Sequence, residues 1–156
     1  MPGYGRTLIG TSTGYVVQVS ADGEPDWKAG GLTIDWSTVT AAGSDTTLPD
    51  GVVIPAGQKG LQFGQVLCRI TATGLYGPYL SGATDGRQTL TRDQCFILNG
   101  SLLEKGPNGI ATVSTIQRGA FDGGLVFGAR LGVGAAGQPT LAALQAVMPR
   151  LQVVNV

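Results

Sequence analysis

The spacing of glycine is the feature that most constrains what this chain can fold into. Residues 51–90 (GVVIPAGQKGLQFGQVLCRITATGLYGPYLSGATDGRQTL) hold short apolar runs separated by Gly57, Gly60, Gly64 and Gly74. Glycine adopts the positive φ values that tight turns need, because it has no Cβ to clash. Such punctuation between β-branched and aromatic residues predicts short strands joined by turns. No nucleophile with its base stands out in this stretch, so we expect it to build a shape and not a reaction centre.

The same pattern continues to the end of the chain and predicts a β-rich domain over residues 51–156. Strand-like runs lie at residues 52–55, 61–70, 95–98, 110–116, 125–131 and 151–154. Pro55 has no amide hydrogen to donate, so its strand belongs at a sheet edge or a strand end. One helix is predicted at residues 140–148, where apolar residues have helical spacing between Pro139 and Pro149. The expected fold is therefore mainly β, with one small C-terminal helix.

Residues 1–50 differ in character and predict an extended N-terminal arm with a linker. Two segments are strand-like, 15–19 (YVVQV) and 32–36 (LTIDW), whereas residues 21–31 are rich in turn signals and residues 37–50 read as linker. So few large apolar residues do not close a core alone. We predict that the arm docks on another protein through four anchors, Trp27, Leu32, Ile34 and Trp36. The alternative is that these strands complete the sheet of the main domain.

The charge balance excludes several classes of function. Lys plus Arg equals Asp plus Glu at 10 each, and the basic residues are scattered, which disfavours nucleic-acid binding. Charged residues make up only 13%, against about 25% in ordinary soluble domains. A weakly charged surface with 26 glycines is poorly solubilised alone and favours an assembly that covers it. No apolar run is long enough for a membrane helix, and the first residues (MPGYGR) show no secretory signal.

The motifs that could suggest a catalytic, cofactor or metal site are better explained as turns and linkers. The chain has no histidine, which removes a Ser/His/Asp site and the commonest metal ligand. Residues 132–137 (GVGAAG) match a dinucleotide-binding pattern, but no acidic residue follows to hold a ribose, so we interpret them as a linker. Asp85, Asp93 and Asp122 are interpreted as turn residues and not as a metal or catalytic cluster. We predict no enzyme activity, no cofactor and no metal site.

The two cysteines, Cys68 and Cys95, each lie inside an apolar strand-like run. Their spacing fits no metal-binding or redox motif. We predict two buried, unpaired thiols that act as small hydrophobic side chains. A disulfide is the alternative, which the lack of a signal segment disfavours.

The order of the elements resembles one family, the head decoration proteins of lambda-like bacteriophages. The matching segments are residues 64–67 (GQVL), 81–86 (SGATDG), 95–98 (CFIL), 118–122 (RGAFD), 125–127 (LVF) and the final alternating strand. The likeness covers about residues 52–154. Residues before about 51 and the insert at 100–109 have no clear counterpart.

The resemblance implies a β-clip or β-tulip-like domain and a structural role in the virion. It implies a homotrimer on the outer surface of the capsid, at threefold positions, with an N-terminal arm that pairs with the major capsid protein and stabilises the expanded shell. Such a protein is made in the host bacterial cytoplasm. One alternative function is a carbohydrate- or surface-binding β module using Tyr4, Tyr15, Tyr76 and Tyr79, and a remote one is an Asp-based hydrolase.

Overall fold

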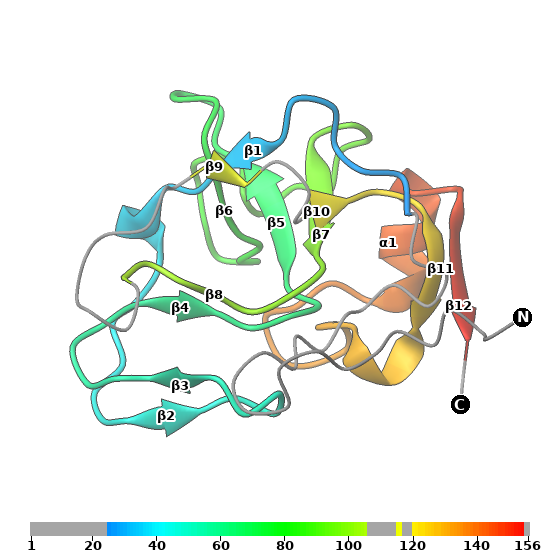
Figure 1. The fold of residues 1–156 in the computed structure, drawn as a ribbon. Coiled ribbons are helices and arrows are strands. Elements are labelled where there is room, and N and C mark those ends of the chain that lie inside the picture. Colours follow the sequence, from blue (N-terminus) through cyan, green and yellow to red (C-terminus); the bar gives the residue numbers. More distant parts are fainter. Residues whose placement is uncertain (1–24, 106–114, 117–119, 155–156) are drawn as a thin grey trace, which may run out of the picture.

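The computed structural model describes residues 25–105, 115–116 and 120–154, and these form a mainly β fold (Figure 1). In chain order the elements are β1 (Leu32–Thr33), the 3-10 helix η1 (Trp36–Thr38), β2 (Thr46–Thr47), β3 (Val53–Ile54), β4 (Gly60–Leu61), β5 (Val66–Arg69), β6 (Tyr76–Pro78), β7 (Cys95–Leu98), β8 (Leu102–Leu103), β9 (Thr115–Ile116), β10 (Ala120–Phe121), β11 (Gly124–Phe127), the 3-10 helix η2 (Gly128–Arg130), α1 (Leu141–Val147) and β12 (Leu151–Val154). The prediction of short strands with one C-terminal helix is confirmed.

A four-stranded antiparallel sheet of order β10-β7-β5-β6 forms the centre of the fold. Its middle strands β5 and β7 come from the two most apolar runs of the sequence, VLCR and CFIL. All four residues of β7 are buried, as are the first three of β5. Both faces of these strands are therefore covered, and each face has its own core.

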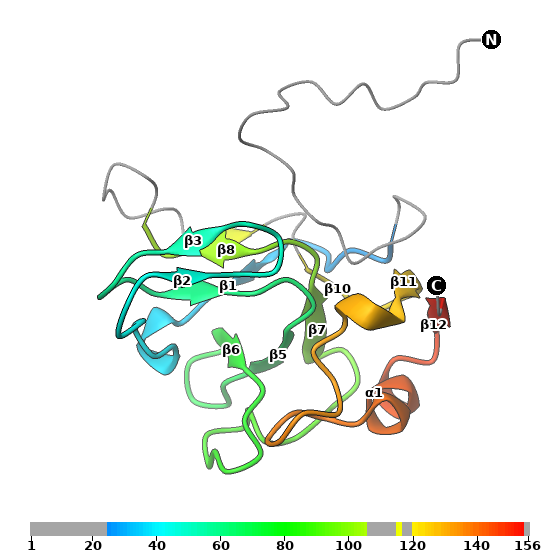
Figure 2. The ribbon, with the colours of Figure 1, turned by 90° about the horizontal axis from the view of Figure 1, so that it is seen from below.

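The two cores follow from the alternation of side chains along a strand. On one face, Val66 and Cys68 of β5 lie with Cys95 and Ile97 of β7 in a cluster that also holds side chains from β10, β11, α1 and β12. We call this cluster the helix-side core. On the other face, the intervening side chains Leu67, Phe96 and Leu98 pack with residues 32–39. We call that cluster the N-terminal-side core. In Figures 1 and 2, α1 with β11 and β12 lies on one side of the central strands, and β1 to β3 lie on the other.

The C-terminal helix forms where the sequence predicts it, with a defined cap. The hydroxyl oxygen of Thr140 accepts a hydrogen bond from the amide of Ala143 at 3.2 Å, and Pro149 follows the helix. Leu144 is fully buried in the helix-side core. Because β11 and β12 pair in parallel, the chain between them needs a crossover, and residues 128–150 with α1 provide it.

Two predicted strands are shorter than expected, for local reasons. The run 61–70 is divided into β4 and β5 at Gly64, whose φ is +78° and whose amide donates to the carbonyl of Leu98 at 2.7 Å. A Cβ at Gly64 would overlap the carbonyl oxygen of Arg130. The run 125–131 is a strand only to Phe127, because η2 follows it. The predicted segments 15–19 and most of 110–116 lie outside the described residues.

Candidate functional site

The four predicted anchors lie on a segment, residues 25–39, that packs along the chain's own sheet. At its start, the amide of Asp26 donates to the carbonyl of Gly123 at 2.8 Å, and that of Lys28 donates to Ala120 at 3.0 Å. Trp27 forms a β-bridge with Phe121, and their rings meet edge to face with centroids 6.2 Å apart. Trp27 is partly buried against the helix-side core.

The next two anchors extend this pairing to other strands. Leu32 lies opposite Ile116 in the antiparallel pair β1–β9. Ile34 forms a bridge with Tyr76, and the amide of Asp35 donates to the carbonyl of Tyr76 at 2.8 Å. Leu32 is 3% exposed and Ile34 is 2% exposed. Both side chains are therefore part of the N-terminal-side core.

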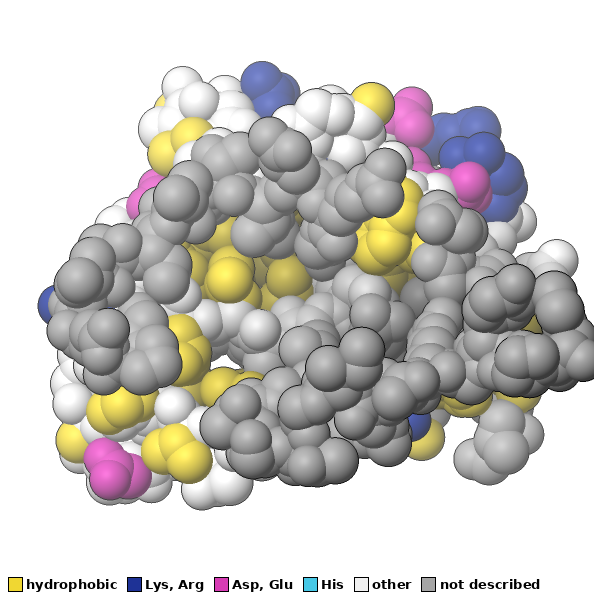
Figure 3. Space-filling model, viewed as in Figure 1, with side chains coloured by type: hydrophobic (Ala, Val, Ile, Leu, Met, Phe, Trp, Pro, Cys, Tyr) yellow, Lys and Arg dark blue, Asp and Glu magenta, His cyan; other side chains and the backbone are white. Residues whose placement is uncertain are grey.

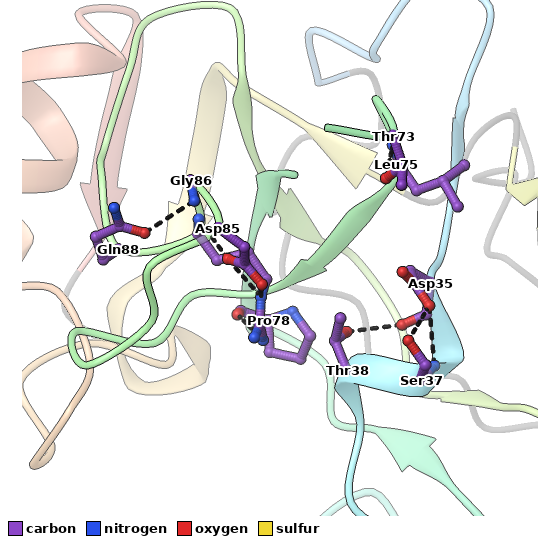
Figure 4. A network of polar contacts seen from close by, with 10 residues as sticks. Asp35, Ser37, Thr38, Thr73, Leu75, Pro78, Asp85, Gly86 and Gln88 are labelled. Atoms are coloured by element: carbon purple, nitrogen blue, oxygen red, sulfur yellow. Dashed lines mark hydrogen bonds and ion pairs between the residues drawn. The ribbon is translucent and has the colours of Figure 1, made fainter. Parts of the chain in front are cut away.

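Trp36 starts the 3-10 helix η1, which Asp35 caps (Figure 4). The carboxylate of Asp35 accepts from the amide of Ser37 at 3.0 Å and from its hydroxyl at 2.6 Å, while the hydroxyl of Thr38 donates to the Asp35 carbonyl at 2.7 Å. Lys59 also contacts η1, because its Nζ donates to the carbonyl of Trp36 at 2.7 Å. The indole is 8% exposed, and its Nε1 has no hydrogen-bond partner among the described residues.

These contacts correct the interpretation of Leu32, Ile34 and Trp36 as anchors for another protein. Their side chains are already buried in the core of this chain, so they present little surface for a partner. Residues 25–50 instead fulfil the alternative drawn from the sequence and complete the domain. An amphipathic strand has the same pattern in both cases, because only its apolar face is specified. Residues 1–24 of the predicted arm lie outside the described residues.

A second polar network lies near the first, since a Cβ at Gly77 would meet both Thr38 and Arg87, and Figure 4 shows both networks. The guanidinium Nε of Arg87 contacts the carboxylate of Asp85 at 2.9 Å, and its Nη1 donates to the carbonyl of Pro78 at 3.3 Å. Burial alone would raise the pKa of Asp85. Hydrogen bonds from the backbone and side chain of Arg87, together with its charge, outweigh burial and lower that pKa below 3.8. The sequence marked Asp85 as a turn residue and gave no signal for its ion pair.

Two other carboxylates, those of Asp26 and Asp122, share one cation near the two ends of the described chain. Arg150 contacts Asp26 at 3.3 Å and Asp122 at 3.8 Å. Burial raises the pKa of Asp122, the charge of Arg150 opposes this, and the nearby carboxylates of Asp26 and Asp93 add to the rise. Within the described residues, no group of three or more Asp, Glu, Cys or His side chains could hold a metal ion.

A small cleft beside β4 and β5 is too small for a typical organic ligand. It has a volume of about 180 Å³ and is lined by Gln62, Phe63, Gln65, Gly132 and Gln138. Binding sites for drug-sized molecules usually have about 300–1,000 Å³. Gly132 of the GVGAAG motif lines this cleft and donates its amide to the carbonyl of Gly64 at 2.8 Å.

The exposed surface of the described residues contains small apolar groups and a free strand edge. The large apolar side chains that are most exposed are Val53 at 44% and Leu80 at 46%. In Figure 3 the visible hydrophobic side chains form several separate groups, and charged side chains of both signs meet near one corner. Both residues of β2, Thr46 and Thr47, are exposed, and β2 pairs only with β3 among the described strands. A strand edge of this kind can accept a further strand.

Cys68 and Cys95 are free and buried, as the sequence predicts. Their direct juxtaposition across β5 and β7 was not predicted. The pairing depends on the register between the two strands, and the sequence does not reveal this register unless the turn lengths determine it.

No described helix is both long and apolar enough to span a membrane. No protein-family model matches the chain, and comparisons with curated proteins and with solved structures found no match either.

Proposed function

We propose that this chain is a structural virion protein that decorates the outer surface of a bacteriophage capsid. The observation that carries the proposal is the order of its short segments, which resembles the lambda-like head decoration proteins. Five strands of the described fold, β5, β7, β10, β11 and β12, lie on or overlap the segments that carry the resemblance. In the proposal the protein binds as a homotrimer at threefold positions of the shell.

Burial of the predicted anchors moves the proposed shell contact to other residues. Residues 1–24 precede the packed segment and contain the strand-like run 15–19, YVVQV. A strand-forming sequence can bind by adding a strand to a partner's sheet, where backbone hydrogen bonds set the register. We assign this role in the proposal to residues 1–24, with the exposed edge of β2 as the second contact surface.

The proposed stabilisation of the shell follows from linkage. A protein that binds the expanded shell better than the unexpanded one shifts the equilibrium toward expansion, by RT ln(1 + [L]/Kd) for each site. A trimer adds multivalency, because the second and third subunits bind at a high effective concentration. Modest contacts in each subunit are therefore sufficient for tight decoration.

The alternative of a carbohydrate-binding module has less support among the described residues. Stacking on sugars requires exposed aromatic faces. Tyr76 is 6% exposed and packs edge to face on Phe96, and Tyr79 packs against the helix-side core. Tyr4 and Tyr15 lie outside the described residues.

Co-sedimentation with emptied phage capsids, before and after expansion, tests the proposal. We expect the full chain to pellet with expanded shells in multiples of three per threefold position. A variant that lacks residues 1–24 should remain folded by circular dichroism and lose most of this binding. Light scattering of the free protein gives its oligomeric state. Retention on immobilised glycans, with no binding to any shell, would overturn the proposal in favour of the carbohydrate-binding alternative.

A further inference from the structure

The two cysteines lie directly opposite each other on neighbouring strands in the middle of the sheet. In the antiparallel pair β5–β7, the register places Cys68 opposite Cys95, and their Sγ atoms are 3.0 Å apart. Both side chains lie on the same face of the sheet, within the helix-side core. They are 0% and 1% exposed. The juxtaposition follows from the strand register and involves no loop.

The hydrogen bonds on either side identify the type of cross-strand pair. The amide of Arg69 donates to the carbonyl of Gln94 at 3.0 Å, so Arg69 and Gln94, the next residues along, form a hydrogen-bonded pair. Hydrogen-bonded and non-hydrogen-bonded pairs alternate along an antiparallel ladder, which makes Cys68 and Cys95 a non-hydrogen-bonded pair. In such a pair the Cα atoms lie about 4.5 Å apart, at the short end of the roughly 4.4–6.8 Å range that disulfides span.

We propose that Cys68 and Cys95 form a reversible intrachain disulfide when the protein meets a hydroperoxide, with the fold otherwise retained. One thiolate attacks an oxygen of hydrogen peroxide, the O–O bond breaks, and the departing hydroxide is protonated to water. The resulting sulfenic acid is attacked by the second sulfur. The S–S bond forms, the S–O bond breaks, and the hydroxyl group leaves as water with the proton of the second thiol. Two thiols are oxidised by two electrons, and the peroxide is reduced to two waters.

Cys95 is the residue that reacts first. Its Sγ accepts a hydrogen bond from the amide of Thr91 at 3.4 Å, and its thiol donates to the carbonyl of Thr89 at 3.6 Å. The hydrogen bond from Cys68 lowers the pKa of Cys95, burial opposes this, and the Thr91 amide lowers it further. Cys68 has a raised pKa, because its thiol proton is held by Cys95 and the group is buried. Thr89 and Thr91 are themselves exposed, so Cys95 contacts two residues that border solvent.

Oxidation would join the two middle strands of the sheet through two cysteines that lie 27 positions apart in sequence. A cross-link over a loop of this length restricts the unfolded chain and, for a protein of this size, raises the melting temperature by roughly 7–14 °C. The two thiols stay reduced in a reducing cytoplasm and form a stabilising cross-link in an oxidising medium. The disulfide is inferred from the strand register and the Sγ–Sγ distance, and it is independent of the proposed function.

The test uses the full chain, reduced, freed of reductant and treated with graded hydrogen peroxide. After denaturation and alkylation, we expect loss of both free thiols, a mass lower by two hydrogen atoms and a proteolytic peptide linking Cys68 to Cys95. The melting temperature should rise by the stated amount and return to its starting value with a reductant. Two alkylatable thiols after excess peroxide, or cross-links only between chains, would overturn the proposal.

Two single variants test the order of reaction. Peroxide-treated Cys68→Ala should stop at a sulfenic acid on Cys95 that dimedone traps, whereas Cys95→Ala should leave Cys68 largely unmodified. Circular dichroism shows whether each variant is folded. If either fails to fold, the rates of alkylation of the two cysteines in the native wild-type chain replace the comparison. Faster reaction at Cys68 in either experiment would overturn the assignment of Cys95 as the first to react.

Discussion

Replacing Trp36 with alanine distinguishes a tryptophan of the core from one that anchors a partner. Trp36 is 8% exposed and packs in the N-terminal-side core with Leu32 and Ile34. If this packing is formed in the free protein, the substitution leaves a cavity and lowers folding stability. If the side chain instead docks on a capsid, the substitution lowers binding affinity and leaves the melting temperature unchanged.

The magnitude follows from the buried area and the state of the indole nitrogen. A tryptophan buries about 150–250 Å², and at 8% exposure this contributes about 3–6 kcal/mol at about 25 cal/mol per Å². Truncation also removes a buried N–H that lacks a partner among the described residues, which relieves about 1–3 kcal/mol. We expect a net loss of about 3 kcal/mol, near the lower end of measured Trp-to-Ala costs of about 3–5 kcal/mol.

Urea and thermal unfolding of the free protein, followed by circular dichroism, measure the loss. We expect the melting temperature to fall by about 6–12 °C, and Trp36→Phe to lose less, because it keeps most of the apolar volume without the N–H. Val53→Ala is the matched control, since Val53 is 44% exposed and its truncation should change stability by no more than about 0.5 kcal/mol. A melting temperature for Trp36→Ala within about 2 °C of the wild type, together with lost capsid binding, would refute the assignment to the core.

Further predictions concern backbone conformation and charge. Gly64→Ala should lower the free energy of unfolding by at least about 2 kcal/mol, because φ is +78° and the methyl group would overlap the Arg130 carbonyl. Gly57→Ala has a similar φ of +77° but open space around it, so it should lower the free energy of unfolding by about 1 kcal/mol. Urea unfolding compares the two variants. Asp122→Asn should raise the melting temperature at neutral pH, because the pKa of Asp122 is raised in the folded state and its ionised form is disfavoured there. This gain should vanish as the pH falls through the raised pKa. A lower melting temperature of the variant at neutral pH would contradict the reasoning. Asp85→Asn should instead lower the melting temperature, because the pKa of Asp85 is lowered in the folded state. The wild type should be the more stable protein above pH 3.8 and should lose that advantage as the pH falls below this value. Melting curves across this pH range check both variants.

The sequence predicted the elements better than their partners. The run CFIL is a strand in any plausible context, and residues 140–148 carry both a cap and a proline stop, so β7 and α1 were predictable. The role of LTIDW was not, because its one apolar face fits this chain's own sheet as well as another protein's. The pairing of Arg87 with Asp85 and of Cys68 with Cys95 depends on turn geometry and strand register, which local pattern does not specify.

The alternation of side chains along β5 and β7 has a consequence for the unfolding transition. Each of the two cores packs on one face of β5 and β7. If the segments that cover one face unfold, apolar side chains of β5 and β7 become exposed, and the same strands also carry the other core. Neither half of the described fold can then melt alone without weakening the other. Cooperativity in this protein comes from shared strands and needs no large interface between separate lobes. Hydrogen exchange should accordingly find one slow unit that spans residues 32–36, 66–69, 95–98 and 144–151.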